Sequence, residues 1–146
     1  MFPEDALVWF TDGSRTDSAT AACIYGVRPN RSFSFPVGKF ASVFQTEIYA
    51  IVQCTYENIR RACKNKRILI FSVSQAALRA LSSPKVTANP VAECQDALLD
   101  LANRNEVTLL WYRASWYTWQ LRAGLSFSNL ASARLQTWQD IYRQTV

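Results

Sequence analysis

The 146-residue sequence contains no histidine. Ser-His-Asp catalysis, Cys-His catalysis and any histidine general base are therefore excluded. The four cysteines, Cys23, Cys54, Cys63 and Cys94, show no CxxC spacing, so we expect buried or idle thiols rather than zinc ligands. Catalysis by this chain would have to depend on carboxylates, lysines or metal ions.

Long apolar runs are absent as well. No segment approaches the roughly 20 apolar residues that span a bilayer, and the start MFPEDALVWF lacks a basic segment ahead of an apolar one. We therefore expect an intracellular protein, nuclear or cytoplasmic, that is neither secreted nor a membrane protein. Hydrophobic residues make up 49% of the chain, which suits one packed core and a single domain over residues 1–146.

The charge balance leans to the basic side. Sixteen Lys and Arg against eleven Asp and Glu give a net charge of +5, which favours a polyanionic partner such as nucleic acid. The same balance is common in proteins that bind no nucleic acid. Net charge alone therefore does not identify a partner.

The first third of the chain predicts three strands. Residues 6 to 11, 19 to 25 and 32 to 37 are β-prone, and the third alternates apolar and polar side chains before Pro36, as an edge strand does. Residues 12 to 14, DGS, form a turn sequence, so we expect a tight reversal there. The arrangement predicts an antiparallel meander.

A long helix is predicted next. Its apolar stripe comprises Phe44, Ile48, Ile51, Val52, Tyr56, Ile59 and Cys63. Ser42 followed by Gln45 is a capping-box pattern that marks the helix start.

The second half continues with strands and helices. Residues 68 to 71 predict a central strand buried on both faces, and Ser74 caps a short helix over 75 to 81. Asn89-Pro90 opens another helix, and residues 107 to 112 predict a fifth strand. A last helix is indicated by the stripe Leu130, Leu135, Trp138, Ile141 and Tyr142. The order βββαβααβα predicts one α/β domain with a five-stranded mixed sheet flanked by helices.

Two carboxylates stand out. Asp12 follows the first strand, and its alternative interpretation is an ordinary Asp-Gly turn residue. Glu47 lies on the apolar face of its helix, where a charge needs a partner such as a metal ion beside a second carboxylate. Its alternative is a glutamate at the helix start that turns to water and interacts with the helix dipole.

Three segments in this order carry a family resemblance: FTDGS at 10–14, FQTEIYAI at 44–51 and SVSQAALRAL at 72–81. They resemble successive signature segments of the type 1 ribonuclease H family, most closely those of non-LTR retrotransposon polyproteins. The resemblance covers about residues 7 to 111. From residue 112 on, only LASA at 130–133 and the helical stripe support it.

The resemblance implies a ribonuclease H-like fold and a chemistry. In that family four carboxylates hold two Mg²⁺ (or Mn²⁺) ions that activate water to cut the RNA strand of an RNA:DNA hybrid. By position, Asp12 matches the first carboxylate and Glu47 the second, so both are the candidate catalytic and metal-binding residues.

The chain departs from the family pattern at two ligands. Val73 stands where the third carboxylate belongs, and Leu125 aligns with the fourth. Ser115 replaces the mobile family histidine. Two carboxylates supply too little charge and too few oxygens for two Mg²⁺ ions, so metal binding would be single and weak at best. We expect ribonuclease activity to be absent or strongly impaired.

Nucleic-acid binding is a separate expectation. The resemblance implies contacts at Gly13, Ser14, Ser74 and Gln75, and the run at 58–67, with Arg60 and Arg61, would add phosphate contacts. The alternative for that run is a solvated helix end.

An aromatic segment, WYRASWYTWQ at 111–120, replaces the polar catalytic loop of the family. We expect Trp111 to be structural. The Trp116 to Trp119 part would offer stacking faces to bases or an apolar surface for a protein partner.

The sequence thus predicts a ribonuclease H-like domain of retrotransposon origin, catalytically degenerate and with retained nucleic-acid binding. One alternative is a weakly active, metal-dependent hybrid ribonuclease. The other is a protein-interaction scaffold with no nucleic-acid role.

Overall fold

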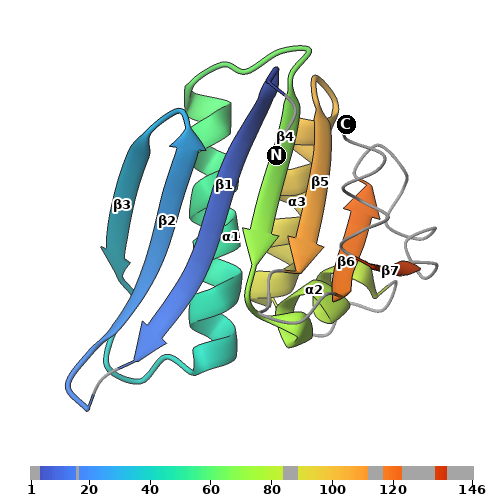
Figure 1. Ribbon diagram of the computed structural model, residues 1–146. Helices are drawn as coiled ribbons and strands as arrows, with labels where there is room; N and C mark the ends of the chain where they lie inside the picture. Colours follow the sequence, from blue (N-terminus) through green and yellow to red (C-terminus); the bar gives the residue numbers. More distant parts are fainter. Residues whose placement is uncertain (1–3, 16, 84–88, 112–116, 123–133, 138–146) are drawn as a thin grey trace.

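The fold is described from a computed structural model, over all residues except 1–3, 16, 84–88, 112–116, 123–133 and 138–146 (Figure 1). Its strands are β1 (Ala6–Arg15), β2 (Thr20–Arg28), β3 (Arg31–Pro36), β4 (Arg67–Ser72), β5 (Glu106–Trp111), β6 (Tyr117–Arg122) and β7 (Arg134–Thr137). Its helices are α1 (Val43–Arg60), α2 (Gln75–Ser82) and α3 (Asn89–Ala102).

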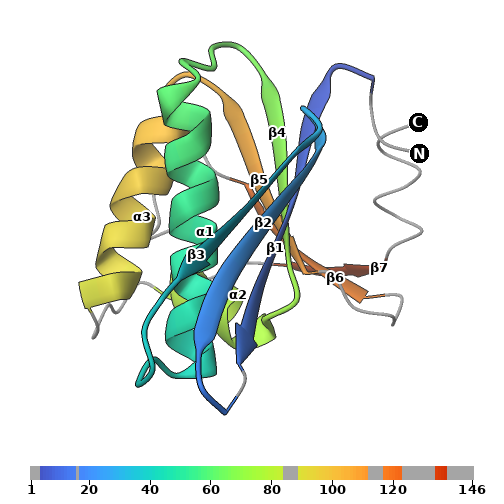
Figure 2. The same cartoon turned by 90° about the vertical axis from the view of Figure 1, so that its left-hand side faces the viewer.

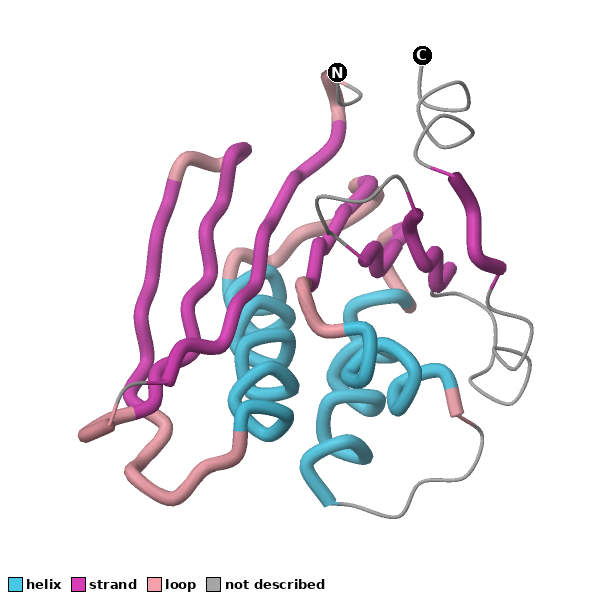
Figure 3. Tube along the Cα trace, turned by 60° about the horizontal axis from the view of Figure 1, so that its bottom comes forward, coloured by secondary structure: helices cyan, strands magenta, loops and turns pink. Residues whose placement is uncertain are grey.

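All the strands belong to one mixed sheet in the order β3-β2-β1-β4-β5-β6-β7. β1, β4 and β5 run parallel, and the remaining neighbours are antiparallel. The three helices gather on one side of this sheet (Figures 2 and 3). The α/β class, the five-stranded mixed sheet β1 to β5 and the three helices therefore follow the predicted order.

The predicted reversal at residues 12 to 14 is wrong. Asp12, Gly13 and Ser14 continue β1 and pair with Cys23, Ala22 and Ala21 of β2. The cross-strand ladder overrides the turn preference of Asp-Gly, because each of these residues gains a partner on β2. Asp12 thus sits inside a strand.

The chain beyond β5 departs from the expected last helix. β6 pairs with β5 and β7 pairs with β6, so the sheet is two strands wider than predicted. Arg134–Thr137 is a strand although residues 130 to 142 carry a helical stripe. The pairing with β6 overrides the helical spacing here, because each residue of β7, including the stripe residue Leu135, gains a cross-strand partner. The other four stripe residues lie outside the described residues.

The start of α1 follows directly from local sequence. Ser42 is the N-cap, and its hydroxyl accepts a hydrogen bond from the Gln45 backbone N–H at 3.1 Å. The Gln45 side chain accepts in return from the Ser42 backbone N–H at 2.9 Å. Reciprocal capping satisfies two N–H groups that the helix leaves unpaired, which fixes where α1 begins.

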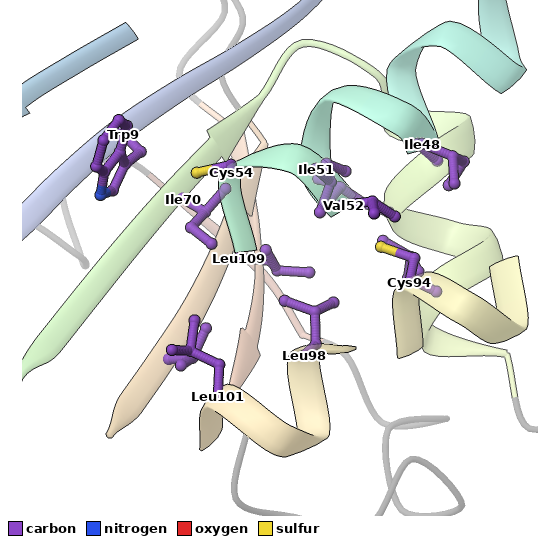
Figure 4. Close-up of a cluster of buried hydrophobic side chains, with 14 of the residues drawn as sticks. Trp9, Ile48, Ile51, Val52, Cys54, Ile70, Cys94, Leu98, Leu101 and Leu109 are labelled. Atoms are coloured by element: carbon purple, nitrogen blue, oxygen red, sulfur yellow. The ribbon is translucent and has the colours of Figure 1, made fainter. Parts of the chain in front are cut away.

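The main core fills the space between the sheet and helices α1 and α3 (Figure 4). Strand alternation sends Ile68 and Ile70 into this core and Leu69 and Phe71 into a second apolar cluster on the other face. β4 is therefore buried on both faces, as predicted for a central strand. The described helices include none with the length and hydropathy needed to cross a membrane.

The predicted burial of thiols is confirmed in part. Cys54 and Cys94 are fully buried in the main core, whereas Cys23 and Cys63 are partly accessible, and all four are free. Burial raises the pKa of both Cys54 and Cys94 well above the usual thiol value, which keeps these thiols protonated.

Trp9 anchors β1 to α1. Its side chain is fully buried, and its indole N–H donates to the Asn58 side-chain oxygen at 3.1 Å. Gly26 of β2 covers the ring, since a β-carbon built there would lie 2.9 Å from Trp9 Cζ3 and would also meet the Pro29 carbonyl oxygen. A side chain at position 26 must therefore displace the indole or the backbone.

We predict that Gly26→Ala lowers the free energy of unfolding by about 1–3 kcal/mol, because overpacking at this level strains a core. Urea unfolding followed by tryptophan fluorescence measures the change. Val27→Thr is the matched control, since Val27 is exposed and both residues are β-branched. Equal stability of the Gly26→Ala variant and the control would contradict the tight Gly26–Trp9 contact.

Candidate functional site

The parallel pairing of β1 with β4 brings two sequence-distant strand ends together. Thr11 pairs with Ser72 in register, so the next residues along the strands, Asp12 and Val73, lie at the same edge of the sheet. Both parallel strands point their carboxyl ends to this edge (Figure 1), which is where open α/β sheets place their ligands. Asp12 is exposed, and Val73 has 43% of its surface exposed.

Glu47 reaches the same place from the first turns of α1. Its side chain is buried, with 4% exposed. A β-carbon built on Gly13 would lie 3.2 Å from Glu47 Cδ and 3.1 Å from its backbone nitrogen. Glycine at position 13 is therefore what allows the Glu47 carboxyl group to pass beside β1 toward Asp12.

The electrostatics of Glu47 are those of a poorly satisfied buried acid. Its pKa is raised from 4.5 to about 7, mainly because the group is buried and to a lesser extent because of the neighbouring charge of Asp12. A hydrogen bond from the Gly13 backbone N–H acts in the opposite direction. The Oε2 atom is buried and has no hydrogen-bond partner within the described residues. Near neutral pH this carboxyl group is therefore partly protonated.

The end of β4 is held by a local hydrogen-bond network. The Ser72 hydroxyl accepts from the Ser74 backbone N–H at 3.1 Å, and the Ser74 hydroxyl accepts from Ala77 N–H at 3.1 Å as the N-cap of α2. The Trp111 indole N–H donates to the Val73 carbonyl oxygen at 3.3 Å. These hydrogen bonds hold the backbone on both sides of Val73 in place at the end of β4.

The residues present do not fit a two-ion magnesium centre. The described part of the chain contains no group of three or more Asp, Glu, Cys or His side chains that could hold a metal ion. Asp12 and Glu47 alone offer two carboxylates, and one of them is partly protonated at neutral pH. Two divalent ions require more anionic oxygen ligands than this pair supplies.

The other predicted binding residues divide into two groups. Gly13, Ser14, Ser74 and Gln75 lie at the carboxyl edge of β1 and β4, near Asp12. Ser14 also donates its hydroxyl proton to the Ala21 carbonyl oxygen, at 3.4 Å.

The two arginines lie elsewhere. Arg60 and Arg61 stand at the C-terminal end of α1. They lie thirteen and fourteen residues after Glu47, or roughly 20 Å along the helix axis. Arg60 also forms an ion pair with Glu57 at 2.9 Å. One nucleic-acid duplex would have to follow the length of α1 to contact both groups.

Some predicted positions cannot be placed. Ser115, Trp116 and Leu125 lie outside the described residues, and of Trp119 only the backbone, in β6, is described. The proposed roles of these residues remain predictions. Trp111 is described, and its buried ring and its bond to Val73 agree with the structural role expected of it.

Sequence reasoning missed two neighbours of the site. Cys23 pairs with Asp12 across β1 and β2, and Thr11, which is buried, ties β1 to β4 through a 3.0 Å hydrogen bond from its hydroxyl to the Phe71 carbonyl oxygen. The pairing register that places both is a tertiary property. No local sequence pattern predicts this register.

Comparison with known proteins supports the fold at the level of structure. No protein-family model matches the chain, and no curated protein matches it in sequence. Among solved structures, the crystal structure of RNase H1 from the halophilic archaeon Halobacterium salinarum NRC-1 is similar, with a TM-score of 0.58 and 14% sequence identity. The match covers 75% of this chain and 86% of that one. This chain therefore has a ribonuclease H-like fold.

We predict that Glu47→Gln stabilises the protein at pH 8. The folded state holds a proton on Glu47 up to about pH 7, whereas an unfolded glutamate loses it near 4.5. This contribution is fully present below the unfolded pKa and is lost as pH rises through the folded pKa. Glutamine keeps an acceptor for the Gly13 N–H without the charge. We expect a gain of about 1–3 kcal/mol at pH 8 that vanishes near pH 4.

Urea unfolding at several pH values, with a chelator present, measures this difference. Glu57→Gln is the matched control, because Glu57 is also buried in α1 but is paired with Arg60. That control should lose up to about 1 kcal/mol at pH 8. A Glu47→Gln variant that is destabilised equally at every pH would show that Glu47 is not a strained acid.

Proposed function

We propose that this chain is a nucleic-acid-binding ribonuclease H-like domain of retrotransposon type whose hydrolytic activity is absent or strongly impaired. The observation that carries the proposal is Val73, exposed at the end of β4 beside Asp12, where the family pattern calls for a third carboxylate. The serines on either side of it, Ser72 and Ser74, match the serines of the family's strand end. A valine there donates no electron pair to a metal ion.

The remaining acids support the same proposal. Glu47 is buried with an unpartnered oxygen and a pKa of about 7, so it is a weak ligand at neutral pH. Leu125 aligns with the fourth family carboxylate, and no Asp or Glu occurs between Glu106 and Asp140. Losing one electrostatic element of a catalytic site commonly costs about 10²-fold to 10³-fold in rate, and two metal ligands should cost more.

Retained binding has its own support. Gly13, Ser14, Ser74 and Gln75 gather at one edge of the sheet, and Ser74 with Gln75 begins α2, whose first N–H groups favour phosphate. A serine hydroxyl that accepts one hydrogen bond can still donate its own proton to a ligand. We propose this edge as the main contact with the backbone of an RNA:DNA hybrid.

One alternative also has a specific observation in its favour. Asp12 and Glu47 are close enough for the charge of Asp12 to raise the pKa of Glu47. Such a pair can hold a single Mg²⁺ or Mn²⁺ with water completing the shell, which would give weak hybrid cleavage. A cleavage assay separates this alternative from an inactive domain.

We predict that the wild-type chain leaves a labelled RNA:DNA hybrid intact with Mg²⁺ and with Mn²⁺. The double variant Val73→Asp with Leu125→Asp should restore cleavage to at least about 100-fold above the wild type, because it completes the carboxylate set. Gel analysis of the RNA strand measures both.

Adding Asp12→Asn to the double variant is the control and should abolish the restored cleavage. Circular dichroism of each variant reports whether it folds. Robust cleavage by the wild type would overturn the impaired-enzyme proposal and favour the weakly active alternative. A folded double variant without activity would overturn the assignment of Leu125.

We predict that the chain binds an RNA:DNA hybrid with a steep salt dependence, measured by fluorescence anisotropy from about 50 to 200 mM salt. Each phosphate contact adds about 0.9 to the slope of log affinity against log salt. If residues 58–67 contact phosphate, the Arg60→Ala, Arg61→Ala double variant should make that slope shallower by the equivalent of one to two phosphate contacts. An unchanged slope would leave these arginines as a solvated helix end.

The scaffold alternative makes the opposite prediction. A domain with no nucleic-acid role should give no saturable anisotropy change with the hybrid at low salt. Duplex DNA of the same length serves as the control ligand. Equal affinity for both duplexes would argue against a surface specific for the hybrid. It would still agree with a surface that binds phosphate in either duplex.

A further inference from the structure

A groove of about 290 Å³ lies on the helical side of the molecule, between the start of α1 and the start of α3. Its lining comes from the β3–α1 connection, α1 and the start of α3: Val37, Ala41, Gln45, Ile48, Tyr49, Val52, Pro90 and Glu93. The lining is mostly apolar. Its volume falls at the lower limit of small-molecule pockets, about 300–1,000 Å³, so it suits anchoring side chains better than a whole cofactor.

The groove and the candidate site use different sides of α1. Gln45, Ile48, Tyr49 and Val52 follow the i, i+3, i+4, i+7 spacing of one helical stripe. At about 100° per residue, Glu47 points roughly 150° away from the centre of that stripe. A partner in the groove would therefore leave the edge at Asp12 and Glu47 accessible.

Two exposed apolar side chains adjoin the groove lining in the sequence. Phe40, next to Ala41 in the chain, has 93% of its surface exposed, and Val43 at the start of α1 has 49% exposed. Single exposed apolar residues are ordinary, whereas an apolar groove with further exposed apolar residues next to its lining in the chain is a candidate interaction site.

The α3 side of the groove is acidic, although the whole chain is basic, and Lys39 of the β3–α1 connection is exposed near the opposite side. Glu93 lines the groove, and Asp96 and Asp100 continue from it along α3 at i+3 and i+7. All three are exposed, and none forms an ion pair within the described residues. Glu93 accepts a hydrogen bond from the Tyr56 hydroxyl at 2.8 Å, which holds its carboxylate at the groove.

These observations together define the occupant. The acidic stripe repels phosphate, so a nucleic acid is disfavoured here. Cationic side chains are favoured beside the stripe, and an apolar stripe is favoured in the groove between them. We propose that this groove binds a basic amphipathic helix of a partner protein, with apolar anchors between α1 and α3 and Lys or Arg side chains against Glu93 and Asp96.

Selection from a displayed library of short helical peptides on the immobilised full chain tests the proposal. Enriched peptides should combine apolar residues at helical spacing with a net positive charge. Their affinity in solution should fall at least about tenfold for Ala41→Arg, which fills the groove, and for the double charge reversal Glu93→Lys with Asp96→Lys. Glu106→Lys carries the same type of charge change away from the groove and should bind as the wild type does.

Four results would overturn the proposal. These are the absence of enriched peptides, enrichment of acidic peptides, peptides whose affinity is unchanged by Ala41→Arg, and displacement of the peptides by an RNA:DNA hybrid. Light scattering of the unliganded chain is the remaining check. A dimer that Ala41→Arg dissociates would identify a second copy of this chain as the occupant instead.

Discussion

The parallel pairing of β1 with β4 is the constraint on which the site depends. Its register places Thr11 opposite Ser72 and therefore carries Asp12 and Val73 to one edge of the sheet. Helix α1 completes the arrangement, since Gly13 lets the Glu47 carboxyl group approach from below the strand. The same β1 is also fixed to α1 by Trp9, which is buried against Asn58 and Gly26. The fold thus brings Asp12, Val73 and Glu47 to one edge of the sheet.

The residues at that edge favour a protein that is stable without metal. In the family pattern, clustered carboxylates repel one another until cations neutralise them. Here Val73 adds no charge, so the remaining electrostatic cost is that of burying the Glu47 carboxyl group. Its unpartnered oxygen and raised pKa show that this group is held away from water. The backbone groups at the end of β4 and the start of α2 have hydrogen-bond partners in Ser72, Ser74 and the Trp111 indole. A ribonuclease H-like fold is therefore compatible with a valine at this strand end.

Local signals made much of this architecture predictable. Ser42 with Gln45 marked the start of α1, Ser74 marked α2, and the unbroken apolar run of β4 marked a strand buried on both faces. Sequence reasoning failed where tertiary pairing decides the outcome. Asp12 and Gly13 resemble a turn but extend β1 because β2 supplies partners, and Leu135 belongs to a helical stripe but lies in β7. The groove beside Glu93 was also invisible, because it is formed by segments that the sequence keeps apart.

Thermal melting of the wild type and of Val73→Asp, each in chelator and in Mg²⁺, tests whether this edge of the sheet is more stable without a third carboxylate. Val73→Asp should melt at a lower temperature than the wild type in chelator, because a third carboxylate joins Asp12 and Glu47 without a cation. Mg²⁺ should then raise the melting temperature of the variant and leave that of the wild type nearly unchanged. A variant that melts higher than the wild type in chelator would show that the valine does not stabilise this edge, and a wild type that Mg²⁺ clearly stabilises would show that Asp12 and Glu47 hold a metal ion without a third carboxylate.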